Sequence, residues 1–424
     1  MPAAPADPLA GKRLLLAVSG SIAAVKVPQL VSALVQRGAQ VRCVLTPSAA
    51  QLVSASALAS LSRNPCYVEA DQWLASQPKP LHIELAEWAE LVLVVPLSAS
   101  SLARLVHGLA DNLLASTLLA SEAPRLLAAA MNTSMWHGPA VQRNWRLLQA
   151  DPGLLALEPA SAGLLACDRR GAGRMREPAQ LLLAAESLAL HGANQDLKGL
   201  RLLISAGPSR EALDPARFLS NPSTGRMGAL MALAAQWRGA EVKLLHGPLQ
   251  LDPAILEGLE CHQFTSAADL ELLLKQHQAW ANGVVMAAAV ADHRLQRPNP
   301  EKLSKTDLHQ QLLQPEAWQT VPDLLQAMVV AKPQQQVLMG FCAHTGDGLA
   351  QAQAKLSQKG CDLLFANPID QADAGFAAPT NKGWLLQQGA APQQLGPCGK
   401  LELAHQLLSQ LNRCLQDLNV PTGF

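Results

Sequence analysis

Short apolar runs alternate with longer stretches of helical spacing along this sequence, and that alternation constrains the fold more than any other feature. In the first part of the chain, the runs that predict buried strands are residues 13–18, 40–45, 91–95 and 125–130. The spacing of residues 22–37 predicts a helix between the first two runs, and Pro96 is expected to end the third. Strands joined by helices in this order form a parallel sheet with right-handed crossovers, so the pattern predicts an α/β fold.

The same pattern starts again after about residue 186. A polar, glycine-containing segment at 188–199 is expected to link the two parts. Beyond it, strands are expected at 200–205, 241–245, 283–290, 336–340 and 362–366, with a helix at 225–238. The sequence therefore predicts two tandem Rossmann-like domains with mostly parallel sheets, one covering residues 1–189 and the other residues 190–424.

The charge balance and the cysteine pattern exclude several classes of protein. Lysine and arginine together number 33, as do aspartate and glutamate, so the chain lacks the basic excess typical of nucleic-acid binders. No apolar stretch approaches the roughly 20 residues that span a bilayer, and the N-terminus does not resemble a signal peptide. The 8 cysteines form no CxxC pair and no Cys/His cluster with zinc spacing. We therefore expect a cytoplasmic protein without a membrane span or a structural zinc.

Small and hydroxyl-bearing residues follow the first three strands. Residues 19–24 open the first helix, and free N–H groups there favour a phosphate, although a tight strand-to-helix turn explains these residues equally well. Thr46 and Ser48 follow the second strand, and Ser98 and Ser101 follow the third. Because the carboxyl ends of parallel strands meet at one edge of a sheet, these loops are expected to hold a phosphorylated cofactor together. The lack of a GxGxxG motif argues against a dinucleotide.

Three further residues of this part have unusual neighbours in the sequence. Asn132 lies in AAMNTSMW (129–136) just after a strand, where it could equally be the cap of a helix. Cys167 lies in the glycine-rich loop 166–178, whose arginines would favour the thiolate, although a surface loop with an incidental thiol is the alternative. His82 precedes a predicted helix, and a lone histidine of this kind is more often structural than catalytic.

Taken together, these segments resemble the homo-oligomeric flavin-containing cysteine decarboxylase family over residues 13–178. The resemblance rests on GSIAA with Lys26, the His82–Ile83 pair, PLSASS, MNTSMW and the ACxxxGxGRM loop, in this order. It implies that FMN lies on the strand ends, in contact with Gly20, Ser21, Ile22, Thr46, Ser48, Ser98 and Ser101. It also implies that His82 is the active-site histidine, that Asn132 grips the substrate carboxylate, and that Cys167 donates a proton.

The chemistry of that family removes the carboxylate of a cysteinyl group, which requires an electron sink at the β-carbon. FMN is expected to oxidise the thiol-bearing carbon to a thioaldehyde, after which CO₂ leaves and an ene-thiolate remains. The reduced flavin returns a hydride and an acid returns a proton, a step that suits a movable thiol such as Cys167. Three positions depart from the family pattern: Ser100, Ala129, and Asp168, which replaces the usual glycine.

The second part of the chain carries a long polar loop, residues 205–228, between a strand and a helix. Loops of this length are usually functional, and Asn221, Ser223 and Thr224 lie where a helix N-terminus could hold a phosphate. An N-cap box explains Ser223 and Thr224 but not the length of the loop.

Charged residues farther along the chain are also candidates for a nucleotide site. Asp292 lies at the end of the predicted strand 283–290, and Lys302 lies in EKLSK. Lys355 and Lys359 are four residues apart on a predicted helix and share one face. A solvated face is the alternative, but lysines that converge on a strand-end pocket would bind a triphosphate.

Residues 198–390 resemble the bacterial phosphopantothenate–cysteine ligases, through SAGPSREALDPARFLSNPSTGRMG, AAAVAD, EKLSK, GF and DLLFAN in the family's order. The resemblance implies CTP as co-substrate and Mg²⁺ beside its phosphates. The nucleotide contacts that it implies are Met286, Ala287, Ala288, Asp292, Lys302, Gln314, Pro315, Glu316, Ala317, Phe341, Lys355 and Lys359. Asn221 is implied to bind the reaction intermediate, and Lys302 to assist its conversion.

Such ligases form an acyl-cytidylate and pyrophosphate from the substrate carboxylate and CTP, and cysteine then displaces CMP. Both parts in one chain resemble the fused bacterial phosphopantothenoylcysteine decarboxylase and phosphopantothenate–cysteine ligase of coenzyme A biosynthesis. The expected function is the conversion of 4′-phosphopantothenate, cysteine and CTP into 4′-phosphopantetheine, in a trimer-based homo-oligomer that extends up to a dodecamer. Two alternatives remain open: a flavoprotein in which one part binds ligand without catalysing, and a relative of the flavin prenyltransferases.

Overall fold

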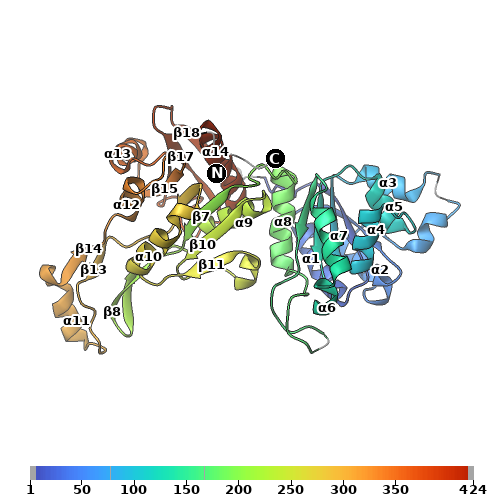
Figure 1. Ribbon diagram of the computed structural model, residues 1–424, viewed down its shortest axis with the longest axis horizontal. Coiled ribbons are helices and arrows are strands. Elements are labelled where there is room, and N and C mark those ends of the chain that lie inside the picture. The colour runs from blue at the N-terminus through green and yellow to red at the C-terminus, as the bar shows by residue number, and fades with distance from the viewer. Residues whose placement is uncertain (1–5, 77, 167, 419–424) are drawn as a thin grey trace.

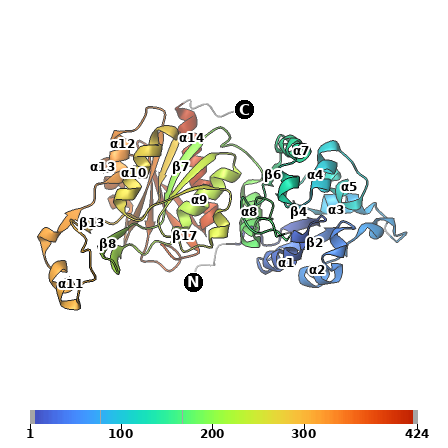
Figure 2. The ribbon, with the colours of Figure 1, turned by 60° about the horizontal axis from the view of Figure 1, so that its bottom comes forward.

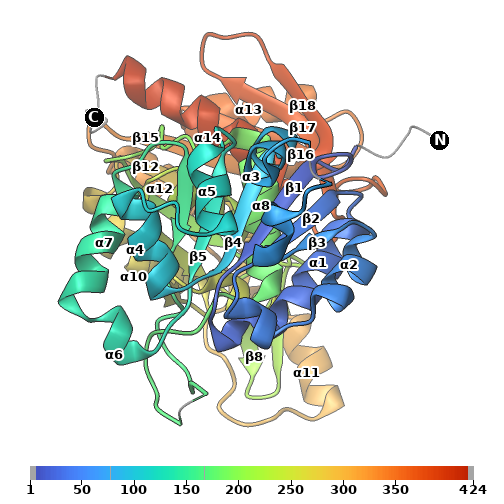
Figure 3. The same ribbon diagram turned by 90° about the vertical axis from the view of Figure 1, so that its right-hand side faces the viewer.

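The computed structural model describes residues 6–76, 78–166 and 168–418, and its first half (residues 6–191) is built on a parallel six-stranded sheet (Figure 1). The strand order is β3-β2-β1-β4-β5-β6, with β1 Arg13–Val18, β2 Gln40–Leu45, β3 Cys66–Tyr67, β4 Leu91–Leu97, β5 Arg125–Ala129 and β6 Leu154–Leu157. The helices are η1 Ile22–Lys26, α1 Val27–Gln36, η2 Ala49–Gln51, α2 Ala55–Ser62, η3 Glu69–Trp73, α3 Leu81–Trp88, α4 Ala99–His107, α5 Leu113–Ala120, α6 Thr133–Trp136, α7 Pro139–Gln149 and α8 Pro178–His191. Figure 3, in which this half faces the viewer, shows α4, α5 and α7 on one side of the strands and α1 and α2 on the other.

The second half (residues 192–418) carries an eight-stranded sheet whose first six strands are parallel and whose last two are antiparallel. Its order is β11-β10-β7-β12-β15-β16-β17-β18, with β7 Arg201–Ala206, β10 Glu241–His246, β11 Glu260–Gln263, β12 Gly283–Met286, β15 Val337–His344, β16 Leu363–Pro368, β17 Thr380–Gln387 and β18 Gln393–Gly399. The helices are α9 Arg226–Trp237, η4 Pro253–Leu256, α10 Ala267–His277, η5 Gln278–Trp280, α12 Leu324–Val330, α13 Leu349–Lys359 and α14 Lys400–Asp417. The expected α/β fold with two mostly parallel sheets is confirmed.

Two small antiparallel pairs and a helix project from the second half, and we call them the outlying lobe. The pairs are β8 Arg210–Asp214 with β9 Arg217–Ser220, and β13 His293–Leu295 with β14 Trp318–Thr320; η6 Pro315–Ala317 precedes β14 and the helix is α11 Lys305–Leu312. Figures 1 and 2 both show the lobe at the end of the molecule that is farthest from α8.

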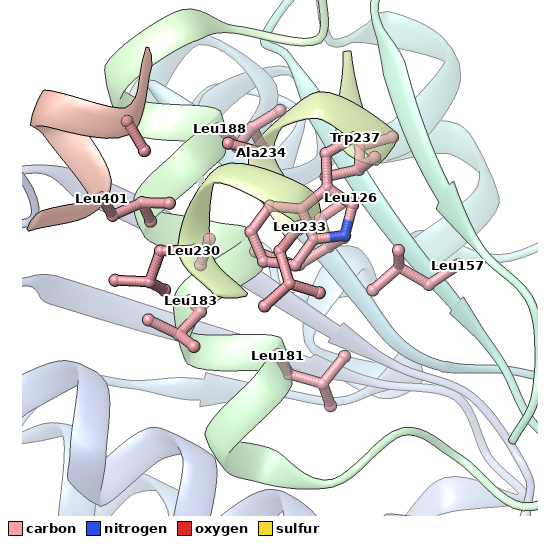
Figure 4. Close-up of a cluster of buried hydrophobic side chains, with 14 of the residues drawn as sticks. Leu126, Leu157, Leu181, Leu183, Leu188, Leu230, Leu233, Ala234, Trp237 and Leu401 are labelled. Atoms are coloured by element: carbon pink, nitrogen blue, oxygen red, sulfur yellow. The ribbon is translucent and has the colours of Figure 1, made fainter. Parts of the chain in front are cut away.

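One continuous apolar cluster joins the two halves. α8 packs against α1 in the first half and against α9 and α14 in the second. Figure 4 shows Trp237 of α9 among leucines of both halves, which include Leu126, Leu157, Leu181, Leu230 and Leu233. Since these side chains are buried, the contact between the halves resembles a domain core more than a flexible tether.

Each sheet reverses its strand order once, and the two reversals mark where ligands are expected. In the first sheet the order reverses between β1 and β4, and in the second between β7 and β12. Open parallel sheets bind ligands in the crevice beyond the carboxyl ends of the strands at this point. The loops that follow these four strands therefore position both candidate sites.

Several expected boundaries were wrong. β4 does not end before Pro96, because Leu97 still pairs with Ala129 across a register shift. The strand expected at 283–290 ends at Met286, and the loop at 205–228 contains the hairpin β8–β9. The expected linker 188–199 begins inside α8, because Leu188 is buried in the cluster between the halves. The expected boundary at 189/190 falls in the last turn of α8 and stays a prediction.

No helix in the described ranges combines the length and apolar character that a membrane crossing requires.

Candidate active sites

A cavity of about 480 Å³ opens beyond the carboxyl ends of β1, β4 and β5 in the first half. The predicted contacts that line it are Gly20, Ser21, Ile22, Ser98 and Asn132. Apolar side chains form much of the remaining wall, including Val25, Met131, Leu164 and Leu165. The cavity therefore combines a polar floor of helix N-termini and hydroxyls with an apolar rim.

Ser19, which the sequence analysis did not single out, fixes the floor of this cavity. Its buried hydroxyl donates to the carbonyl of Pro96 at 2.8 Å and accepts from the N–H of Ser98 at 2.7 Å. The end of β1 is thereby tied to the end of β4. Ser98 in turn caps α4, since its hydroxyl accepts from the N–H of Ser101 at 3.3 Å. Ser19 could have been identified from the sequence because it directly follows β1.

The loop after β2 packs behind the same floor, through a close approach of Ser48 to Gly20. A Cβ atom at position 20 would overlap the Cβ of Ser48, so this approach requires glycine. Thr46 is buried, and its hydroxyl accepts from the N–H of Ala49 at 3.2 Å. The loops that follow β1, β2 and β4 thus meet at one edge of the sheet, as expected from the sequence.

Asn132 lies on the cavity wall at the start of α6. Its Oδ1 accepts from the N–H of Ser134 at 2.9 Å, which fixes the side chain as the helix cap. Cys167 lies outside the described residues, but Ala166 and Gly173 on either side of it line the same cavity. The carbonyl of Gly173 accepts from the N–H of Met131 at 3.0 Å, so the glycine-rich loop 166–178 and the Asn132 segment are held together.

Four of the described residues predicted for this site, Thr46, Ser48, Ser101 and His82, are not among those that line the cavity, and His82 lies on a different element from the others. It is half-buried in α3, rather than before the helix as expected, and it is not among the described residues that line the cavity. Lys26 does line the cavity and pairs with Glu177 at 2.7 Å, which ties η1 to the N-terminus of α8.

The second candidate site is the crevice position expected beyond the carboxyl ends of β7 and β12, where the strand order of the second sheet reverses. The hydroxyl of Ser205 accepts from the N–H of Ala288 at 3.2 Å, and that of Ser209 accepts from the N–H of Ala291 at 3.1 Å. Asn221 donates through Nδ2 to the carbonyl of Val290 at 3.1 Å. The structure therefore brings Asn221 to the segment from Met286 to Asp292, as the predicted site requires. Ser209, which the sequence analysis did not name, belongs to the same arrangement.

The N-terminus of α9 borders this crevice and depends on glycine. Gly225 caps the helix with a φ of +72°, and a Cβ there would overlap Leu249. One helical turn later, a Cβ on Gly228 would lie 2.7 Å from the carbonyl oxygen of Ser205, so α9 sits directly on β7. The N-terminus of α9 thus lies at the end of β7, where the positive end of the helix dipole favours an anion.

The remaining predicted nucleotide contacts lie on other elements. Lys302 is exposed in the outlying lobe, where its neighbour Leu303 accepts from Nη2 of Arg217 at 2.6 Å and donates to Asp214 at 3.2 Å. Residues 314–317 lie in the same lobe, around η6. These hydrogen bonds attach the segment that contains Lys302 to the hairpin β8–β9.

Phe341 lies in β15, and Lys355 and Lys359 lie in α13, the helix that follows β15 along the chain. Phe341 packs edge-on against Phe365, with ring centroids 5.5 Å apart. Lys355 and Lys359 share one face of α13, as expected; Lys355 is exposed, whereas Lys359 forms an ion pair with Asp323. A bound phosphate at Lys359 would compete with that carboxylate.

Within the described residues, no group of three or more His, Cys, Asp and Glu side chains is arranged to hold a metal ion.

Two family models match the chain in succession. The model described as Flavoprotein matches residues 3–188, and the model described as DNA/pantothenate metabolism flavoprotein C-terminal domain matches residues 197–415.

Known relatives match almost the whole chain. It is 38% identical over 406 residues to the coenzyme A biosynthesis bifunctional protein CoaBC of Bacillus subtilis, covering 95% of this chain and 97% of the relative. The protein of the same name from Escherichia coli K12 is 36% identical over 403 residues, covering 94% and 96%. Among solved structures, the C-terminal domain of a protein named CoaBC is 31% identical, covers 52% of this chain and 99% of that chain, and has a TM-score of 0.43.

Proposed function

Since the chain belongs to the family of bifunctional coenzyme A biosynthesis proteins, we propose that its two strand-end sites divide the two reactions of that family between them. The chain is a phosphopantothenate–cysteine ligase and a phosphopantothenoylcysteine decarboxylase. The crevice between β7 and β12 is assigned to ligation, and the cavity beyond β1 and β4 to decarboxylation. The observation that carries the assignment is that Gly20, Ser21 and Ser98 line a cavity at the reversal point of the first sheet, while Asn221 contacts the segment after β12 at the reversal point of the second.

The walls of the first cavity are chemically complementary to FMN. The hydroxyls and helix N-termini around Ser21 and Ser98 suit the phosphate, and the apolar rim suits the flat isoalloxazine ring. Gly20 leaves room for a close approach of backbone to ligand. When bound there, FMN supplies the electron sink that the loss of CO₂ requires.

The residues of the chain supply binding and proton transfer in the decarboxylation. Asn132, fixed by its bond to Ser134, orients the substrate carboxylate at the cavity wall. The thiol of Cys167 donates the proton that completes the product, since its neighbours in the glycine-rich loop 166–178 line the cavity. His82 is proposed as the active-site histidine.

In the ligation, the carboxylate of 4′-phosphopantothenate attacks the α-phosphate of CTP and pyrophosphate leaves. The amine of cysteine then attacks the acyl carbon, and CMP leaves with the bonding electron pair. Asn221 is proposed to hold the acyl intermediate, with residues 286–288 and Asp292 at the nucleotide and Lys302 assisting the conversion. Mg²⁺ is proposed to enter with the nucleotide phosphates, which provide oxygen ligands of their own.

The protein is proposed to be a cytoplasmic, trimer-based homo-oligomer. Apolar side chains are exposed at the mouth of the first cavity: Ile22 and Val25 at 56%, Met135 at 49% and Leu164 at 57%. A second copy of the chain would remove this surface from water.

A coupled assay by mass spectrometry tests the assignment. Purified chain receives 4′-phosphopantothenate, cysteine, Mg²⁺ and either CTP or ATP, and 4′-phosphopantetheine is expected with CTP. Asn132→Ala is expected to accumulate 4′-phosphopantothenoylcysteine. Asn221→Ala is expected to make no such intermediate while it still decarboxylates the intermediate when this is supplied. The reverse pattern, or no effect of either change, would overturn the assignment of the sites.

A further inference from the structure

Lys400 occupies a position that is unfavourable for a cation in three respects. It is 4% exposed, it is the first residue of α14, and Arg226 lies close enough to influence it electrostatically. Burial, with a smaller effect of Arg226, lowers the pKa of Lys400 to about 8. A positive charge at a helix N-terminus also opposes the helix dipole. Such a lysine needs strong compensating contacts to keep its place.

Those contacts are two backbone carbonyls of one loop. Nζ of Lys400 donates to the carbonyl of Gly375 at 3.0 Å and to that of Phe376 at 2.9 Å. The Phe376 carbonyl also accepts from the hydroxyl of Thr224 at 3.1 Å. One carbonyl oxygen therefore joins α14 to the loop before α9.

The loop before α9 is the part of the ligase site that carries its hydroxyls. Oγ1 of Thr224 accepts from the N–H of Arg226 at 3.4 Å, and Oγ of Ser223 accepts from the N–H of Gly225 at 3.3 Å. Asn221, on the same loop, reaches the carbonyl of Val290. Any displacement of Phe376 would thus act on the helix N-terminus that faces the crevice.

We propose that Lys400 is a positioning residue of the ligase, which holds the Gly375–Phe376 backbone against Thr224 and so keeps the α9 N-terminus in place for the phosphate of 4′-phosphopantothenate. This inference rests on the proposed ligase site. Lys400 touches no reacting atom; it acts through Phe376 and Thr224. The substrate class is a phosphate monoester, since the positive end of the α9 dipole favours an anion.

The test compares Lys400→Met with Lys275→Met in the full chain. Lys275 is an exposed lysine on α10, paired with Glu271, and serves as the matched control. Pyrophosphate release is followed at varied 4′-phosphopantothenate, and decarboxylation of supplied 4′-phosphopantothenoylcysteine is followed separately. Lys400→Met is expected to raise KM for 4′-phosphopantothenate about tenfold or more, the size of a lost charge-assisted hydrogen bond, with kcat changed less than about threefold. Lys275→Met is expected to leave both constants unchanged.

A purely structural role would give a different result. Partial unfolding lowers the fraction of active enzyme, so kcat would fall while KM stayed the same, and that outcome would overturn the proposal. Should Lys400→Met fail to fold, Thr224→Val removes the other hydrogen bond to the same carbonyl and is expected to raise the same KM. Asn221→Ala distinguishes a wrong ligase site from a wrong role for Lys400. If Asn221→Ala leaves ligation intact, the proposed ligase site is wrong. If Asn221→Ala abolishes ligation but Lys400→Met leaves KM unchanged, only the role of Lys400 is refuted.

Discussion

The hydroxyl of Ser187 lies 3.0 Å from Nε2 of His405, and this contact joins α8 of the first half to α14 of the second. Both residues are buried, and the ring of His191 stacks on that of His405 with centroids 5.3 Å apart. Arg238 donates to the carbonyl of His405 at 3.0 Å and pairs with Asp196 at 2.6 Å. The two halves are therefore joined by a specific polar cluster as well as by the apolar one.

The polar cluster makes stability sensitive to acid. Burial, aided by Arg238 and His191, lowers the pKa of His405 to about 3, so the folded protein holds this ring neutral. In the unfolded chain the ring titrates near 6.5, and the unfolded state therefore binds more protons between these values. The stability contributed by the neutral ring is present above about pH 6.5 and is lost as pH falls toward about 3.

Urea unfolding at pH 7.5 and pH 5 checks this expectation. The protein is expected to lose about 2 kcal/mol at pH 5 through His405. His405→Gln keeps a polar partner for Ser187 but does not titrate, so its loss of stability should be smaller. His107→Gln, at an exposed site, should behave as the unchanged protein. Equal acid sensitivity in both variants would count against His405.

The apolar contact between the halves is expected to depend on Trp237. This side chain is 5% exposed and packs among leucines of both halves (Figure 4). Trp237→Ala should lower the free energy of unfolding by about 3–5 kcal/mol, because the cavity that it leaves cannot close fully. Trp73→Ala removes an equally large side chain that is 80% exposed, so it should cost little. Calorimetry on both variants measures the difference.

Flavin binding is expected to depend on the close approach of Gly20 and Ser48. Gly20→Ala places a Cβ on that of Ser48 and should push the loop after β2 away from the floor of the cavity. The affinity for FMN should fall about tenfold or more, as measured by flavin fluorescence on titration. Adding Ser48→Gly removes the overlapping atom, so the double variant should regain part of the affinity. No recovery would mean that the overlap is not the cause.

The strand positions could be predicted because an apolar run is a local property of the chain. β1, β2 and β10 begin at their expected residues for this reason. The approach of Gly20 to Ser48 and the bond between Ser187 and His405 join distant segments, and no local pattern encodes them. Lys400 had no signal either, since GKLEL is an ordinary start of a helix.

The backbone conformation at Asp168 shows why the family pattern has glycine at this position. Its φ is +60°, in the left-handed region that favours glycine, which is the residue that the family pattern has there. The sequence showed the substitution, but the conformation that makes it costly became visible only in the structure.

Ligation is expected to fail selectively when Gly225 is changed. Gly225→Ala would strain a φ of +72° and overlap Leu249, and so would displace the α9 N-terminus from the crevice. The kcat/KM for pyrophosphate release should fall at least tenfold, while decarboxylation of supplied 4′-phosphopantothenoylcysteine stays within about twofold. Gly389→Ala is the matched control: its φ is +75°, but no heavy atom lies within 4 Å of the added Cβ. Since both variants carry the same backbone strain, a loss of ligation confined to Gly225→Ala would trace the effect to the overlap with Leu249. An equal loss in both would instead trace it to general destabilisation.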